Sequence, residues 1–371
     1  MAGIYIHIPF CKTRCIYCDF YSNTSMRIKA QFLDALCTEI TARASELSQQ
    51  NITTLYFGGG TPSQLSPSDW ERIFEALGRS FCLDALTEVT LEANPDDLSP
   101  SYIQTLRKFP FNRISIGIQT FDSEKLRLLN RRHNQHQAIE AVRQCQTNGF
   151  DNISIDLMYG LPQQTLEQWQ QDLEIALSLD VQHISSYHLI YEPDTELYKR
   201  YVTGQLAPVD DTLSVQLFET LIHTLKEAGY THYEISNFAK PSFCSQHNSS
   251  YWKGIPYLGL GPSAHSFDGE NRHFNPSSLS AYIQNPLVRN TEQLSADEKY
   301  NDLILTAIRT HWGLDLNEVA RRFGQARRAY CLEMAQPFLQ TNKLRLEKDT
   351  LYLTEAGIFI SDAIMSEMMF V

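Results

Sequence analysis

The sequence contains no apolar run that approaches the roughly 18 residues required for a membrane-spanning helix. Its first residues, MAGIYIHIPF, lack the basic segment and the long apolar stretch of a secretory signal peptide. Positive charge is also scarce, because 31 Lys and Arg residues stand against 43 Asp and Glu residues and give a net charge of −12. Proteins that bind the phosphate backbone of nucleic acids need the opposite balance. These absences predict a cytoplasmic protein with no transmembrane segment and no nucleic-acid partner.

The cysteine content predicts thiols or a metal site rather than a disulfide framework, because the chain carries no export signal. Of the eight cysteines, only Cys11, Cys15 and Cys18 lie close together in the sequence. We expect most of the other five to be small core residues. With 371 residues, of which 43% are hydrophobic and 20% charged, the chain can form one large domain and a smaller one.

Apolar strands alternate with amphipathic helices through the first two thirds of the chain. We expect strands at 4–8, 52–57, 87–93, 113–119, 152–160 and 183–190, with one further strand at 231–239. We expect helices at 26–49, from Ser66, near 99–109, twice across 122–149, at 165–180 and at 211–228. This alternation implies parallel strands joined by right-handed crossovers. It predicts an α/β fold, either a full or partial (β/α) barrel or a doubly wound open sheet.

The alternating pattern weakens after about residue 240, which suggests three parts. We predict a barrel over residues 1–240, a linking segment over 241–294 and a smaller, mainly helical domain over 295–371. The last part ends in a hairpin followed by a helix, as in a winged-helix module. Because the chain is acidic, we interpret this module as a packing or partner-docking element rather than a DNA-binding one.

The cysteine loop, CKTRCIYC, is compatible with several states of its thiols. Thiolates suit both zinc and iron–sulfur clusters. Structural zinc normally takes four protein ligands, and His7 could complete such a set, although its place on a strand favours packing or hydrogen bonding. Three unligated thiols are another alternative. Three thiolates on a [4Fe–4S] cluster would leave one iron open to a small molecule that binds through an amine and a carboxylate.

The C-x₃-C-x₂-C spacing after a first strand resembles the loop that defines the radical S-adenosylmethionine superfamily. Tyr17, just before the last cysteine, also fits that loop. The resemblance implies a [4Fe–4S] cluster on Cys11, Cys15 and Cys18, with S-adenosylmethionine bound at the open iron. It implies a barrel of the type found in that superfamily.

Further positions match residues that contact S-adenosylmethionine in one branch of the superfamily, the oxygen-independent coproporphyrinogen III oxidases. GGGTP includes Gly59, Gly60 and Thr61, where only glycine lets the backbone approach the ligand closely. A plain strand-to-helix turn is the structural alternative for this segment. The remaining matches have side chains suited to the ammonium, ribose or carboxylate of the ligand, although each could also be a surface or capping residue. They are Tyr5, Glu92, Gln119, Arg131 and Asp156.

Two features depart from the oxidases and resemble the HemW group of haem chaperones. Phe20 stands where the oxidases have a further cysteine, and HNSSYW at 247–252 is followed by GLGPSAHS at 259–266. Neutral imidazole is a good haem ligand, so His247 is the first candidate and His265 the second. Tyr251 and Trp252 offer flat apolar surface for a porphyrin. A hydrogen-bonded structural loop is the alternative for this motif.

The resemblance, which covers roughly residues 3 to 270, implies a chaperone that binds haem and delivers it to acceptor haem proteins. S-adenosylmethionine would then gate haem transfer or the formation of a homodimer, and we assign no catalytic residue. The alternative function is oxidative decarboxylation of coproporphyrinogen III by a 5′-deoxyadenosyl radical. A third interpretation is a zinc-stabilised binding protein.

Overall fold

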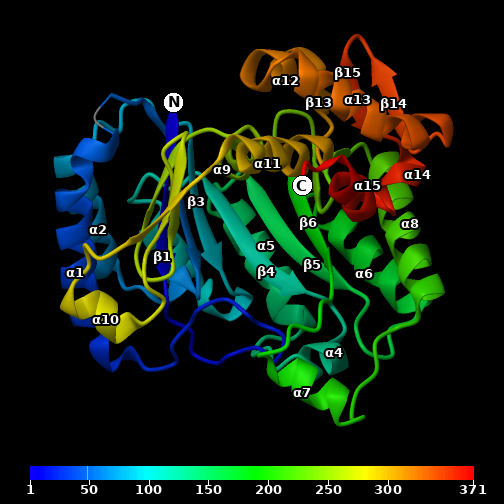
Figure 1. The fold of residues 1–371 in the computed structure, drawn as a ribbon. Helices are drawn as coiled ribbons and strands as arrows, with labels where there is room; N and C mark the ends of the chain where they lie inside the picture. The colour runs from blue at the N-terminus through cyan, green and yellow to red at the C-terminus, as the bar shows by residue number, and fades with distance from the viewer. Residues whose placement is uncertain (48) are drawn as a thin grey trace.

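The computed structural model describes residues 1–47 and 49–371, and within these ranges twelve strands form one sheet (Figure 1). The central strands run parallel in the order of the chain. They are β1 (Ala2–Ile8), β2 (Ile52–Gly59), β3 (Glu88–Ala93), β4 (Arg113–Gln119), β5 (Ile153–Tyr159) and β6 (His183–His188). The sheet curves but does not close, because β12 and β7 remain as its two edges. The predicted partial barrel is thereby confirmed.

Helices cover the outer face of the curved sheet (Figure 1). They are α1 (Lys29–Ala42), α2 (Pro67–Ser80), α3 (Pro100–Leu106), α5 (Gln135–Thr147), α6 (Leu166–Ser178) and α8 (Asp211–Glu227). The short helices α4 (Ser123–Leu128) and α7 (Glu196–Val202) lie instead at the C-terminal end of the parallel strands, near the cysteine loop (Figure 1). The helix predicted at 26–49 is shorter, because 3₁₀ turns occupy Met26–Ile28 and Ala44–Leu47 on either side of α1. Residue 48 of that prediction lies outside the described residues. Ser66 caps α2 in a capping box with Asp69, as its position before the helix suggests.

Side chains alternate between the two faces along each strand, which gives the sheet an apolar outer face and a polar inner face. Ile4, Ile6 and Ile8 of β1 are fully buried in one core with Phe32 and Leu36 of α1. The inner face instead carries polar side chains that bond to one another across the strands. Among them are Tyr5, His7, Thr54, Tyr56, Glu92, Ser115, Ser154, Asp156 and His183. A polar interior is unusual for a core and points to a binding site.

Residues 241–294, predicted as a linking segment, contribute four strands to the main sheet. The segment contains α9 (Gln246–Trp252), β9 (Tyr257–Leu260), β10 (His265–Phe267), β11 (Asn271–Phe274), α10 (Leu279–Gln284) and β12 (Asn290–Gln293). β9 pairs parallel to β1, and β10 to β12 follow as antiparallel neighbours. The division of the chain into three domains stays a prediction. The single strand predicted at 231–239 is wrong, because β7 (Thr231–Glu234) and β8 (Asn237–Ala239) form a tight antiparallel pair.

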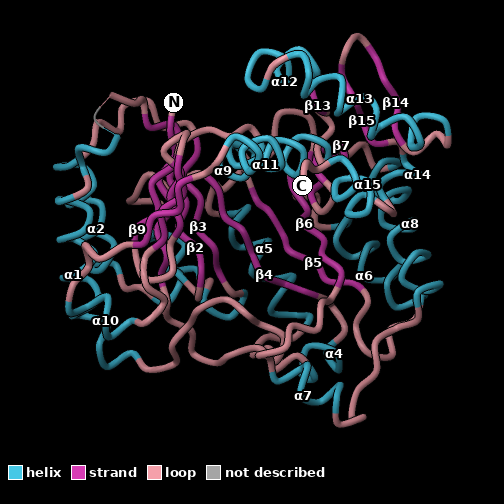
Figure 2. The backbone as a smooth tube through the Cα atoms, in the orientation of Figure 1, coloured by secondary structure: helices cyan, strands magenta, loops and turns pink. Residues whose placement is uncertain are grey.

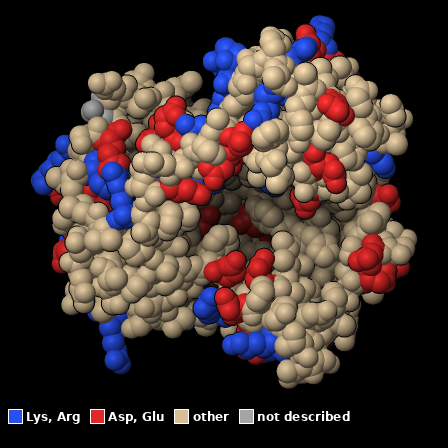
Figure 3. Space-filling view, viewed as in Figure 1, with Lys and Arg blue, Asp and Glu red and all other residues tan. Residues whose placement is uncertain are grey.

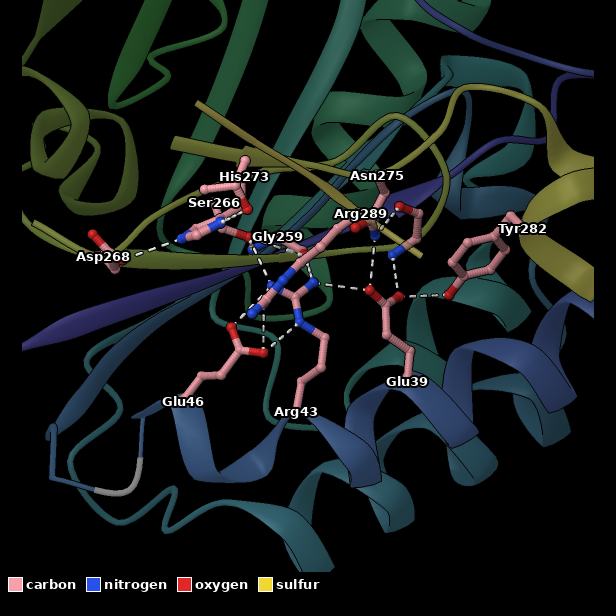
Figure 4. A network of polar contacts seen from close by, with 12 residues as sticks. Glu39, Arg43, Glu46, Gly259, Ser266, Asp268, His273, Asn275, Tyr282 and Arg289 are labelled. Carbon is pink, nitrogen blue, oxygen red and sulfur yellow. Dashed lines mark hydrogen bonds and ion pairs between the residues drawn. The ribbon is translucent and has the colours of Figure 1, made fainter. Parts of the chain in front are cut away.

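A buried polar network attaches this four-stranded extension to α1 (Figure 4). The carboxylate of Glu39 is fully buried and accepts hydrogen bonds from Arg43, the Gly261 amide, Asn275 and the Tyr282 hydroxyl, at 2.6–2.9 Å. Burial raises the pKa of Glu39, although the hydrogen bonds from Tyr282, Gly261 and Asn275 and the charge of Arg43 act against that rise. The extension is therefore held by specific polar contacts as well as by apolar packing.

The C-terminal region, residues 294–371, is fully described and has its own apolar core and a three-stranded sheet. Its elements are α11 (Ala296–Ile308), β13 (Leu314–Asp315), α12 (Leu316–Phe323), α13 (Gln325–Gln340), β14 (Leu344–Glu347), β15 (Thr350–Leu353), α14 (Glu355–Ile358) and α15 (Ser361–Met368). The region lies beside the N-terminal ends of the parallel strands (Figure 1). The loops that follow those strands, including the cysteine loop, gather at the opposite end (Figure 2). No helix in the described part of the chain combines the length and apolar character needed to cross a membrane.

Candidate functional site

The cysteine loop leaves the C-terminal end of β1 and is anchored by backbone hydrogen bonds. Cys11 donates its amide to Asn23, and Asn23 donates its amide to Pro9, so the loop returns to its own start. The Cys18 amide bonds to the Cys15 carbonyl, which closes a tight turn between the second and third cysteines. All three side chains are half-buried free thiols. The predicted cluster ligands therefore lie together on one short, closed loop.

Two donors from loops elsewhere in the chain, one after β2 and one after α4, point at the sulfur atoms of this loop. The Thr61 hydroxyl donates to Cys11 Sγ at 3.3 Å, and Arg131 Nη1 donates to Cys15 Sγ at 3.5 Å. Burial raises the pKa of Cys11 and raises that of Cys18 to about 11. When iron binds, it takes the place of the thiol protons and leaves thiolates. Hydrogen bonds and a buried guanidinium stabilise such thiolates.

Arg131 connects the cysteine loop to the ends of β3 and β4. Its Nη2 donates to Asn94 Oδ1 at 2.7 Å and to the Gly117 carbonyl, and Asn94 in turn bonds to Thr61. Arg131 Nε is buried and has no partner among the described residues. An unpartnered buried donor beside the sulfur atoms fits a carboxylate-bearing ligand at this site. The residues present are thus compatible with both a cluster and S-adenosylmethionine.

A site for a single metal ion, such as zinc, is the alternative to a cluster. The described ranges contain no group of three His, Cys, Asp or Glu side chains placed to hold one metal ion. A four-iron cluster does not need such a group, because each thiolate binds a different iron. His7, the alternative fourth ligand, has Nδ1 at 3.2 Å from the Tyr5 hydroxyl and Nε2 at 2.9 Å from the Tyr21 carbonyl oxygen. Burial lowers the pKa of His7 to about 4. Its hydrogen bonds favour the packing role.

Glu92 lies at the mouth of the barrel, next to the glycine motif. It accepts hydrogen bonds from the Tyr56 hydroxyl at 2.7 Å and from the Gly59 amide at 3.2 Å. Burial raises the pKa of this carboxyl to about 7. Gly59 has a φ of 102°, and a side chain on Gly60 would lie 2.7 Å from the Ile8 carbonyl oxygen. The motif therefore requires glycine for its own backbone path, in addition to any ligand.

The other predicted contact residues lie around the same interior. Asp156 accepts a bond from Ser115 at 3.4 Å, and burial raises the pKa of its carboxyl to about 6. Gln119 ends β4 in the left-handed region with a φ of 73°. Tyr5 stacks on Tyr56 with ring centroids 6.1 Å apart. Tyr17 packs against a small apolar cluster on the cysteine loop, where burial raises its pKa. We keep their contacts with S-adenosylmethionine as a prediction.

His247 lies at the opposite end of the barrel interior from the cysteines. Its Nδ1 is 2.8 Å from Thr54 Oγ1 and its Nε2 is 2.8 Å from the Tyr251 hydroxyl. The side chain is 1% exposed and stacks on Tyr56 at 5.1 Å, and burial lowers its pKa to about 3. Iron ligation would require one of these bonds to open. This geometry favours the structural alternative for the motif, whereas His265 is exposed on β10 and stacks on Phe274 at 5.6 Å.

A groove of about 790 Å³ separates the segment 251–272 from the C-terminal region. Its aromatic lining comes from Tyr251, Trp252, Tyr257, Phe267 and Trp312. Its basic lining comes from Lys253, Arg272, Lys299, Arg321 and Arg322. Basic side chains gather over α12, whereas acidic ones lie around the central hollow (Figure 3). Acidic side chains line the groove as well and form ion pairs with most of these cations: Glu270 with Lys299, Asp302 with Arg272, and Glu318 with Arg321 and Arg322. The groove is large enough for a ligand of drug size or somewhat larger, and its aromatic rings favour one that is flat.

Two residues of the site, Tyr56 and Asn94, have no counterpart in the sequence prediction. Asn94 directly follows the end of β3, which is where functional residues gather in a barrel of this kind, so its position was a usable signal. Tyr56 lies within β2 and is indistinguishable in the sequence from an ordinary core tyrosine.

Comparison with known proteins agrees with this fold. The family model of the radical SAM superfamily matches residues 5–176, and the family model of the HemN C-terminal domain matches residues 294–360. The solved structure of the Escherichia coli coproporphyrinogen III oxidase HemN shares the fold, with a TM-score of 0.86 and 24% identity over 99% of this chain and 90% of that one. These matches define a radical SAM protein of HemN-like architecture.

Relatives that match over the full length define the family more closely. The heme chaperone HemW of Bacillus subtilis is 32% identical over 98% of both chains. HemW of Mycobacterium tuberculosis (strain H37Rv) is 32% identical over 99% of this chain and 94% of its own. The chain therefore belongs to the HemW family within the radical SAM superfamily.

Proposed function

We propose that this chain is a cytoplasmic haem chaperone that binds haem and delivers it to acceptor haem proteins. The observation that carries the proposal is the full-length similarity to proteins named heme chaperone HemW, which extends through both the barrel and the C-terminal region. Acceptor proteins are then its macromolecular partners, and a homodimer is a further proposal.

In this proposal Cys11, Cys15 and Cys18 hold a [4Fe–4S] cluster, which supplies one iron without a protein ligand. The Thr61 hydroxyl and the Arg131 guanidinium stabilise the sulfur atoms to which they donate. The unpartnered Nε of Arg131 would bind the carboxylate of S-adenosylmethionine.

The remaining predicted contacts complete the S-adenosylmethionine site. Gly59 and Gly60 keep the backbone open beside the ligand, and Glu92 offers a carboxylate to its ammonium or ribose. Asp156 and Gln119 extend the polar lining. Tyr5 and Tyr17 add aromatic surface.

The groove between 251–272 and the C-terminal region is our proposed haem-binding site. Tyr251, Trp252 and Trp312 provide flat apolar surface. Arg321 and Arg322, which both pair with Glu318 in the structure, would turn from that carboxylate to the two propionates. Burying a porphyrin against aromatic rings while its carboxylates meet guanidinium groups satisfies both parts of the molecule. The segments that line the groove lie at the barrel end opposite the cysteine loop, so the haem and the cluster would occupy separate sites (Figure 1).

The oxidase reaction is the alternative. The likeness to HemN concerns the fold alone, and Phe20, which is 70% exposed on the cysteine loop, departs from the oxidase pattern. A zinc-stabilised binding protein is the third interpretation, and metal and sulfide analysis separates it from the other two.

The proposal is tested with the purified full chain, reconstituted anaerobically with iron and sulfide. We expect it to bind haem stoichiometrically and to pass that haem to a haem-depleted acceptor protein. Under reducing conditions with S-adenosylmethionine and coproporphyrinogen III, we expect no protoporphyrinogen. Conversion of coproporphyrinogen coupled to 5′-deoxyadenosine, or a failure to bind haem, would contradict the proposal.

A further inference from the structure

The groove has an unusual composition for a haem site. Among the described residues that line it there is no His, Cys or Met, which are the side chains that most often bind haem iron. His247 lies behind the groove wall with both ring nitrogens engaged. The groups in the lining that match a known class of haem ligand are the phenol oxygens of Tyr251 and Tyr257, because tyrosinate also ligates haem iron.

The two tyrosines differ in what their hydroxyl groups do. The Tyr251 hydroxyl lies 2.8 Å from His247 Nε2 and is therefore directed away from the groove, into the barrel. The Tyr257 hydroxyl makes no hydrogen bond within the described residues, although its ring meets that of Tyr251 edge to face at 4.6 Å. Tyr257 is thus the phenol that remains available to a ligand.

The sheet places suitable neighbours around Tyr257. Phe267 of β10 is its direct partner across the strand pair, and Arg272 of β11 is the direct partner of Phe267. Directly paired residues project from the same face of a sheet, so the three side chains form one row on the groove wall. Burial raises the pKa of the Tyr257 phenol; the Arg272 guanidinium acts against that rise, while Asp302 of α11, which forms an ion pair with Arg272, adds to it. A porphyrin ring placed over this row would contact the apolar ring of Phe267, and the Arg272 guanidinium would lie close to the Tyr257 phenol.

We propose that Tyr257 is the axial ligand of ferric haem in this groove. The inference rests on the proposed function and adds the identity of the ligand. On binding, the phenol O–H bond breaks, an Fe–O bond forms and the proton leaves to solvent, with no change in oxidation state. Arg272 stabilises the phenolate formed in this step. Because phenolate is a hard anion, it binds ferric iron more tightly than ferrous iron, so this site prefers oxidised haem.

The test is a titration of the full-length protein with ferric haem, followed by absorption and electron paramagnetic resonance spectroscopy. Tyr257→Phe is compared with Tyr201→Phe, which removes the same atom from an exposed tyrosine of α7 that does not line the groove. We expect Tyr257→Phe to lose the high-spin spectrum with its phenolate-to-iron charge-transfer band and to bind ferric haem at least about tenfold more weakly. Tyr201→Phe keeps the band. With ferrous haem, Tyr257→Phe and wild type bind with similar affinity.

Other outcomes would overturn this assignment. A spectrum and an affinity that Tyr257→Phe leaves unchanged would exclude Tyr257. A low-spin imidazole spectrum that disappears in His265→Ala would assign the iron to the exposed histidine on the same sheet. Resonance Raman spectroscopy of the wild-type complex, which needs no variant, must show phenolate modes. Failure of the wild type to bind any haem would overturn the proposed function itself, whereas haem binding with another ligand overturns only this inference.

Discussion

The attachment of the four-stranded extension to α1 predicts a large effect for Glu39→Gln. The two carboxylate oxygens of Glu39 receive four donors, from Arg43 and Asn275 on one oxygen and from Gly261 and Tyr282 on the other. Glutamine keeps one acceptor oxygen and turns the other into an NH₂ group, so two donors lose their acceptor in either orientation. If Tyr282 rotates to accept, one buried donor still remains unpaired. At about 1–3 kcal/mol for each such group, plus the lost ion pair, the free energy of unfolding should fall by about 2–4 kcal/mol.

The matched control is Glu75→Gln. Glu75 also pairs with an arginine four residues later on a helix, Arg79 on α2, but its side chain is 60% exposed. An exposed pair contributes about 0–1 kcal/mol. Urea unfolding followed by tryptophan fluorescence gives the global stability, and hydrogen exchange of residues 257–293 reports on the extension alone. A loss below about 1 kcal/mol for Glu39→Gln, or a loss equal to that of the control, would refute the reasoning.

Three further predictions concern the site. Because burial places the pKa of Glu92 at about 7, this carboxyl must release a proton to bind a cationic ligand at lower pH, so the affinity for S-adenosylmethionine should fall by up to about tenfold per pH unit below 7. Equilibrium dialysis across pH 5.5–8.5 measures this, and Glu92→Gln should flatten the profile; a wild-type affinity that does not change with pH would contradict it. Cys15→Ser should abolish iron and sulfide incorporation while Cys82→Ser, at an exposed cysteine, retains it, and zinc without sulfide in the wild type would count against the cluster. His247→Ala should lower stability by about 2–4 kcal/mol, because two buried hydrogen bonds and a ring stack are lost, and should leave the iron-ligand spectrum unchanged. A stable His247→Ala variant that loses that spectrum would identify His247 as the ligand.

The barrel could be predicted from the sequence because each parallel strand is a short apolar run bounded by a turn and followed by an amphipathic helix. The four-stranded extension could not be predicted because it lacks this pattern. Its strands have three or four residues, and they lie among glycines, prolines and aromatic residues that carry no clear period. The antiparallel pair β7–β8 was missed because its turn at Ile235–Ser236 contains no glycine or proline to mark it.

In the site, likewise, motifs of neighbouring residues were predictable, whereas contacts between residues far apart in the sequence were not. The three cysteines and the glycine motif were predictable because their spacing alone defines a loop. The partner of His247 was not, since Thr54 lies 193 residues away and reaches His247 only through the pairing of strands. Likewise, the motif ranked His247 above His265 as a haem ligand. In the structure, however, His247 is buried and hydrogen-bonded, whereas His265 is exposed.

The most direct test of the central claim is a haem-transfer measurement. The full chain is loaded anaerobically with one equivalent of ferric haem, separated from free haem and mixed with a haem-depleted acceptor enzyme, whose recovered activity and absorption spectrum report delivery. We predict transfer faster than from an equal concentration of haem bound to serum albumin, with no conversion of coproporphyrinogen III in parallel samples. Retention of haem by the chain, transfer no faster than from albumin, or production of protoporphyrinogen would contradict the account.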